Sequence, residues 1–127
     1  MREFMLLIRN ESNNFDWLST EQQQEFLQKC KDYIGELKKE GKLIAAQPLV
    51  REGKIISGST GAWMESTLNN TGVVQVGYYH ILADNMDEAV AIAKNNPEFE
   101  YGTTASIEVR PVKMKEESTG FVYPKNE

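Results

Sequence analysis

Residues Val73 to Pro97 read VVQVGYYHILADNMDEAVAIAKNNP, and the rest of the chain is organised around this stretch. Its first eleven residues lack aspartate, glutamate, lysine and arginine and are rich in valine and tyrosine, which suit a pleated, half-buried surface. Both alternating sets of side chains are largely apolar, which is typical of a strand in a sheet covered on both sides. Simple alternation places on one face Val74, Val76, Tyr78, His80 and Leu82. Gly77 is the kind of residue that marks a bulge or a close approach by another group.

The residues that follow this strand carry the start and stop signals of a helix. Asn85 is a good N-cap, and Glu88 stands three residues later, where its side chain can reach back to the cap amide. An apolar stripe at helical spacing comes next, and Asn95-Asn96-Pro97 ends the helix. We therefore predict a strand that leads directly into a short amphipathic helix.

The same signals, followed outward, predict a buried strand over Glu3–Arg9, a helix from Ser19 to about Glu40, a strand over Leu43–Val50, a returning strand over Lys54–Ser57 and a last strand over Ala105–Pro111. Ser19 and Gln22 have the spacing of a capping box. Pro48 restricts its strand to a sheet edge or a bulge. Glu52-Gly53 is typical of a hairpin turn, and Gly58–Gly72 is expected to be a long loop.

Size and composition limit the class of protein. A chain of 127 residues with 40% hydrophobic and 26% charged residues is typical of one globular domain, which we expect over 1–112 with a tail over 113–127. The net charge of −5 argues against nucleic-acid partners and against an anionic membrane surface. One cysteine excludes an internal disulfide, and no apolar run is long enough to span a bilayer. We expect a cytoplasmic protein.

The order of these elements is β-α-β-β-α-β with an extra hairpin strand, which is the split βαβ arrangement. Two right-handed crossovers place both helices on one face of an antiparallel sheet, so the predicted fold class is α+β. The other face is then bare and partly apolar. A second copy of the chain is the simplest cover, and we expect a homodimer that packs face to face and encloses a cleft.

Several short motifs connect this chain to a known family: Phe4-Met5-Leu6-Leu7-Ile8, Glu40-Gly41-Lys42-Leu43, Gly77-Tyr78-Tyr79, Asp87-Glu88-Ala89, Pro97 and Glu108-Val109-Arg110-Pro111-Val112. With these motifs in this order over roughly 1–112, the chain resembles the YCII-related family, and within it the DGPF-type branch. The resemblance implies a ferredoxin-like fold and a dimeric α/β barrel, but it implies little about chemistry. The YCII branch has a histidine on the first helix, thought to act with an aspartate. The equivalent position here is Cys30, so that pair does not carry over.

Four polar residues on two predicted strands are candidates for a ligand site. Tyr78 and His80 share one face of the central strand, and Glu108 and Arg110 share one face of the last strand. If these faces line the cleft, they suit a small carboxylate or carbonyl ligand with Arg110 as its anchor. His80 is the only histidine. It acts as a general acid–base catalyst in one interpretation and is a structural residue in the other. Glu108 and Arg110 are otherwise a surface ion pair.

Two further residues complete the candidate set. Cys30 lies on the inner stripe of the first helix, where it either lines the cleft or is a small core residue. Trp63 lies in the Gly58–Gly72 segment, which either closes over a ligand or makes dimer contacts. No second histidine or cysteine stands at metal-ligand spacing, and phosphate-binding motifs are absent, so we expect neither a metal nor a cofactor.

Three functional hypotheses remain open at this point. The leading one is a homodimer that binds a small polar organic molecule in a cleft on the open sheet face. The second is a cofactor-free isomerase, lyase or oxygenase of the dimeric α/β barrel type, with His80 as acid and base. The third is a regulatory or accessory protein without catalytic activity.

Overall fold

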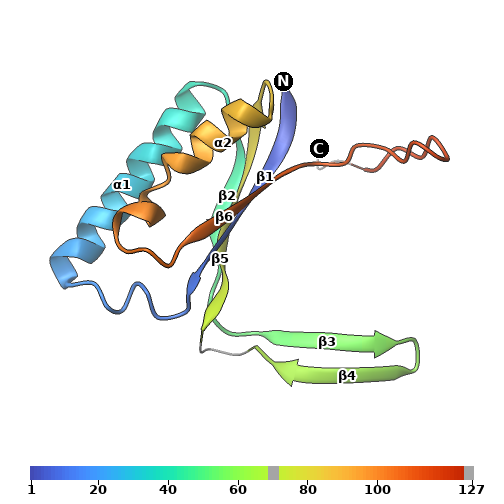
Figure 1. Ribbon diagram of the computed structural model, residues 1–127, viewed down its shortest axis with the longest axis horizontal. Helices are drawn as coiled ribbons and strands as arrows, with labels where there is room; N and C mark the ends of the chain where they lie inside the picture. Colours follow the sequence, from blue (N-terminus) through green and yellow to red (C-terminus); the bar gives the residue numbers. More distant parts are fainter. Residues whose placement is uncertain (69–71, 125–127) are drawn as a thin grey trace.

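The computed structural model describes residues 1–68 and 72–124 (Figure 1). Its elements in chain order are β1 (Arg2–Glu11), α1 (Thr20–Lys39), β2 (Leu43–Pro48), β3 (Lys54–Ser59), β4 (Ala62–Thr67), β5 (Val73–Ala83), α2 (Met86–Lys94), the 3-10 helix η1 (Pro97–Glu100) and β6 (Ser106–Pro111). None of the helices in these described ranges is both long and apolar enough to cross a membrane.

Four strands form the main sheet in the order β2-β5-β1-β6, and every neighbouring pair is antiparallel. Both helices cover the same face of this sheet, and its other face is open (Figure 1). This is the predicted α+β, ferredoxin-like arrangement. The sheet of the single chain is open and does not close into a barrel.

The local signals that predicted the two helices are present. The Ser19 hydroxyl accepts from the amide of Gln22, whose side-chain oxygen in turn accepts from the Ser19 amide, which completes the capping box. The Asn85 side chain accepts from the Glu88 amide at 2.9 Å, as predicted. The Glu88 carboxylate accepts from the amide of Asp84, one residue before the cap, and not from the cap amide that the sequence suggested. Each helix therefore begins where its cap residue satisfies the first free amides.

The core lies between the helices and the sheet. Its buried side chains come from alternate positions of β1 and β5 and from the inner faces of both helices: Phe4, Leu6, Ile8, Leu37, Val74, Val76, Tyr79, Ile81, Ala83, Ala89 and Ala93. Burial of this apolar surface is what stabilises the short helix α2, which is too short to be stable alone.

The prediction that Val74 and Val76 share a face with Tyr78 and His80 is wrong. Ile8 of β1 lies opposite Gly77, but the next residue of β1 lies opposite Gln75, so β5 contains one extra residue at this point. Such a bulge reverses the alternation of side chains. Val74 and Val76 therefore point into the core, whereas Tyr78 and His80 lie on the open face.

The predicted hairpin over Leu43–Ser57 is also wrong. β2 pairs with β5, and β3 instead pairs with β4, which lies inside the predicted Gly58–Gly72 loop. The turn of the hairpin is at Gly61, whose φ of 81° suits glycine, whereas Gly53 does not have a positive φ. Residues 69–71 of the predicted loop lie outside the described residues.

Two segments project from the body on the side of the open face (Figure 1). One is the β3–β4 hairpin, and we call the other the C-terminal arm, residues 113–124. The arm is held by a bridge between Lys115 and Val122, and the amide of Tyr123 donates to the carbonyl of Met114. Residues 125–127 of the predicted tail lie outside the described part of the chain.

Candidate functional site

A cavity of about 910 Å³ lies between α1 and the sheet, on the face that the helices cover. Small residues on three elements leave this space unfilled: Gly35 on α1, Ala46 on β2 and Gly77 on β5. Gly77 also lets β2 approach closely, because an added Cβ would stand 3.0 Å from the carbonyl oxygen of Gln47. The bulge thus shapes the floor of the cavity.

Tyr79 rises from the floor of this cavity. Its ring packs edge-on against Tyr33 with the ring centroids 5.3 Å apart, and the Tyr33 hydroxyl donates to the carbonyl of Ile92 at 2.7 Å. The Tyr79 hydroxyl has no hydrogen-bond partner within residues 1–68 and 72–124. Burial raises the pKa of both hydroxyls, so both are neutral donors at physiological pH.

The wall formed by η1 is polar. Glu98 accepts hydrogen bonds from the side-chain amides of Asn10 at 2.8 Å and Asn14 at 3.3 Å. Asn96, which is only 3% exposed, accepts from the Glu98 amide, while its Nδ2 has no partner among the described residues. An unsatisfied buried donor costs about 1–3 kcal/mol, and a bound molecule or an ordered water is one way to satisfy it.

Cys30 lines the cavity from α1. Burial, together with the negative charges of Glu98 and Glu100, raises the pKa of its thiol to about 11. The thiol is therefore protonated at neutral pH, and Cys30 is a small apolar wall residue rather than an activated nucleophile.

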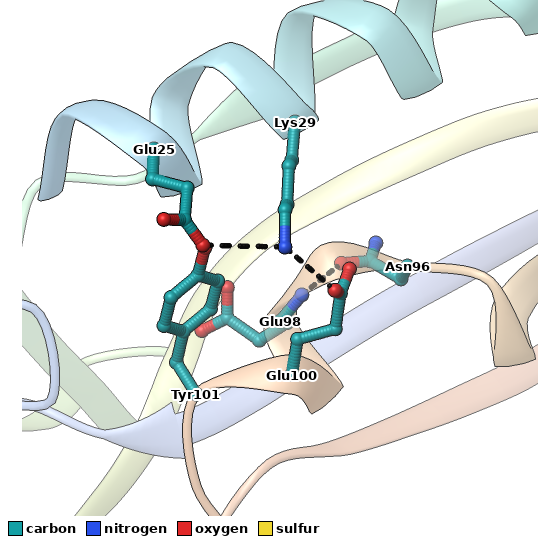
Figure 2. A network of polar contacts seen from close by, with 6 residues as sticks. All are labelled: Glu25, Lys29, Asn96, Glu98, Glu100 and Tyr101. Atoms are coloured by element: carbon teal, nitrogen blue, oxygen red, sulfur yellow. Dashed lines mark hydrogen bonds and ion pairs between the residues drawn. The ribbon is translucent and has the colours of Figure 1, made fainter. Parts of the chain in front are cut away.

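A network of surface contacts joins α1 to η1 beside the cavity (Figure 2). The Lys29 ammonium lies 3.3 Å from the Glu25 carboxylate and 2.9 Å from the Glu100 carboxylate. The Tyr101 hydroxyl donates to Glu25 at 2.7 Å. These groups are exposed, so they fix the position of the η1 wall more than they stabilise the fold.

The rim of the cavity contains a cation next to the hairpin. One terminal nitrogen of the Arg51 guanidinium donates to the carbonyl of Leu49 at 2.9 Å, and the other donates to the side-chain oxygen of Asn14 at 3.4 Å. A guanidinium has five N–H groups, so Arg51 retains donors beyond these two contacts. The rim can therefore bind an acceptor or an anionic group.

Four of the residues predicted from the sequence do lie together, but on the opposite face of the sheet from this cavity. Met5 of β1 is paired with both His80 and Arg110, and Leu7 is paired with both Tyr78 and Glu108. These four predicted side chains therefore occupy two adjacent rows on the open face.

Two side-chain contacts lie on this open face, a hydrogen bond between His80 and Glu3 and an ion pair between Arg110 and Glu108. The His80 imidazole is 2.8 Å from the Glu3 carboxylate, with side chains only 18% and 12% exposed. Arg110 and Glu108 form a looser pair at 3.5 Å and are largely exposed. The ligand-binding roles of these residues stay predictions.

The remaining two predicted residues lie elsewhere. Cys30 is on the helix-covered side, and Trp63 is on β4, where 62% of it is exposed. The predicted set is thus divided among three places. Sequence reasoning missed Tyr79, Arg51 and Glu98. Tyr79 could have been found if the bulge had been placed at Gly77, because that shift moves Tyr79 to the covered face.

Comparison with known proteins identifies the domain. No curated protein matches the chain significantly. A family model described as the YCII-related domain matches residues 2–113, which include the whole main sheet, both helices and the cavity. The chain therefore belongs to the YCII-related domain family.

Proposed function

We propose that the protein is a homodimer in which each protomer binds a small organic molecule in the cavity between α1 and the sheet. The observation that carries the proposal is the cavity itself. Its volume of about 910 Å³ falls in the range of roughly 300–1,000 Å³ that is common for ligand sites. Apolar side chains with a few converging polar groups are the usual composition of such sites.

The polar groups suggest the chemistry of the ligand. The neutral Tyr79 hydroxyl suits a carbonyl or hydroxyl oxygen at the floor, and Arg51 suits a carboxylate at the rim. Glu98 and the apolar walls disfavour a second anionic group near η1. We therefore expect a mostly apolar molecule with one hydrogen-bond acceptor inside and its negative charge at the rim.

The homodimer is supported by the open face of the sheet. Half-buried apolar or aromatic side chains lie on it, the largest of them Met5, Leu7, Tyr78 and Leu82. The chain has an accessible surface of 8950 Å², whereas a compact monomer of 14.4 kDa has about 6,800 Å². The excess of roughly 2,100 Å² is surface that a partner can bury.

A second candidate function is acid–base catalysis at His80, as in a cofactor-free isomerase, lyase or oxygenase. The observation that favours it is the short contact between His80 and Glu3, because a carboxylate orients an imidazole for proton transfer. This candidate places the reaction on the open face inside the dimer, and His80→Ala would abolish turnover while leaving binding in the α1 cavity unchanged.

The primary proposal is tested with anilinonaphthalene sulfonate, which combines an apolar ring system with one anionic acceptor. Gly35 has nothing within 4 Å of an added Cβ, so Gly35→Leu puts a side chain into the cavity without a backbone clash. We expect the dissociation constant of the dye to rise at least about tenfold. The matched control is Gln24→Leu, an exposed position of the same helix outside the cavity lining.

Tyr79→Phe, which removes the donor at the floor, should weaken binding of the dye by a smaller factor. Failure of the dye to bind, or equal affinity for Gly35→Leu and Gln24→Leu, would overturn the proposal.

A further inference from the structure

The β3–β4 hairpin has no hydrophobic core of its own. Its two strands pair over six residues each, and every one of these residues is exposed. Figure 1 shows the hairpin standing away from the main sheet. A two-stranded hairpin by itself is marginally stable in water. The hairpin therefore needs a surface to pack against.

Both faces of the hairpin are apolar. The register places Ile56 and Trp63 on one face, with 66% and 62% of each residue exposed. Ile55 and Met64 lie on the other face, at 50% and 69%. Exposed large apolar side chains that lie together mark interaction surfaces in soluble proteins, and the face with Trp63 carries the larger of the two apolar pairs.

The direction of the hairpin indicates where the covering surface lies. In Figure 1 the hairpin and the C-terminal arm leave the body near opposite ends of the sheet, and both extend on the side away from the helices. The arm also exposes large apolar and aromatic side chains: Met114, Phe121, Val122 and Tyr123. A body that packs on the open face therefore lies between these two projections.

A second copy of this chain fits that position. The roughly 2,100 Å² of excess surface per chain is comparable to the burial of about 1,000–2,500 Å² per protomer in obligate homodimers. Each chain has a net charge of −5, which opposes association of two copies. The hairpin contributes nothing to this repulsion, because Lys54 and Glu65 are its only charged residues and they cancel.

We infer that the β3–β4 hairpin is a clasp that packs on the second copy of this chain, with Trp63 and Ile56 buried at the contact. This inference rests on the proposed homodimer, and it adds that association depends on the hairpin as well as on the open face. Trp63 is then an aromatic anchor of the kind that dominates interface energetics. Under this inference, Trp63 stabilises the dimer and does not contact a ligand.

The test compares the two tryptophans of the chain. Trp63 and Trp17 are 62% and 67% exposed in the single chain, so neither Trp63→Glu nor Trp17→Glu disturbs the core. The dimer dissociation constant is measured by sedimentation equilibrium, with far-ultraviolet circular dichroism as the check on folding. We expect Trp63→Glu to raise the constant at least about tenfold and Trp17→Glu to leave it unchanged.

The possible outcomes distinguish a failure of the clasp from a failure of the proposed homodimer. A monomeric wild-type protein would overturn the homodimer, whereas a wild-type dimer with the same dissociation constant in Trp63→Glu would overturn the clasp alone. A second measurement uses Trp17→Phe, in which Trp63 is the only tryptophan. Acrylamide quenching of Trp63 should decrease as the protein concentration rises through dimer formation, and quenching that is independent of concentration would also refute the clasp.

Discussion

Replacement of Gly77 by alanine is expected to destabilise the fold, because the new methyl group would meet the backbone of a neighbouring strand. An ideal Cβ at this position stands 3.0 Å from the Gln47 carbonyl oxygen and 3.3 Å from the Cα of Pro48, and both distances are shorter than ordinary contact. Backbone atoms of β2 cannot rotate away as a side chain can. Overpacking of this kind costs about 1–3 kcal/mol.

The size of the effect can be expressed as a melting temperature. A chain of 127 residues, at about 2.1 cal/mol/K per residue, has an unfolding entropy of roughly 0.27 kcal/mol/K. A loss of about 2 kcal/mol then lowers Tm by about 7 °C. The measurement is thermal unfolding by circular dichroism at one fixed protein concentration, because association shifts apparent stability.

Gly35→Ala is the matched control. It is the same chemical change in the middle of α1, where nothing lies within 4 Å of the added Cβ. Alanine in a helix interior gains roughly 0.5–1 kcal/mol over glycine, so this variant should have a slightly higher Tm. The two variants thus have opposite signs. A Gly77→Ala protein as stable as the wild type would refute the close approach of β2 to β5.

Four further predictions concern the core and the cavity wall. The pKa of the Cys30 thiol is raised from 9.0 to about 11, so near pH 7 the thiolate is about 100-fold scarcer in the folded than in the unfolded chain. Alkylation by iodoacetamide should therefore be about 100-fold slower in the folded protein. Equal alkylation rates with and without urea would contradict this. The Cys30 thiol stays protonated to a higher pH in the folded state than in the unfolded state. The free energy of unfolding should therefore fall as the pH rises from about 9 through 11. Phe4→Ala should cost about 3–5 kcal/mol in urea unfolding, since Phe4 is fully buried, whereas Trp17→Ala should stay within about 0.5 kcal/mol. Tyr33→Phe should cost about 1 kcal/mol because it removes a 2.7 Å hydrogen bond, and an unchanged urea midpoint would argue against that bond.

The parts of the fold that were predicted correctly depend on neighbours along the chain. The caps Ser19 and Asn85 act on amides three residues away, and the apolar stripes of the helices repeat every three or four residues. Helix positions and the long strands β1 and β5 could therefore be read directly. The pairing of β3 could not, because both β2 and β4 are near it in sequence, and the choice depends on where the turn occurs.

Among the candidate sites, the open-face residues could be predicted from the sequence, whereas the cavity could not. Tyr78 and His80 were predicted to share a face of one strand, and Glu108 and Arg110 a face of another. Both pairs lie on the same face of the sheet, because β1 pairs with both of their strands in matching register. The cavity was not predicted because it results from side chains that are missing. Gly35 and Ala46 are ordinary in their own elements, and only their position opposite Tyr79 makes them lining residues.

The extra residue in β5 has a consequence for anyone who redesigns this protein. The strand consists of two halves whose inside and outside positions alternate in opposite phase, with the change at Val76 and Gly77. A polar substitution at Gln75 or at Tyr78 affects the same outer surface, although one position is odd and the other even. Libraries that vary this surface must therefore count positions separately from each end of the strand, and deletion of one residue at the junction would exchange core and surface for one entire half.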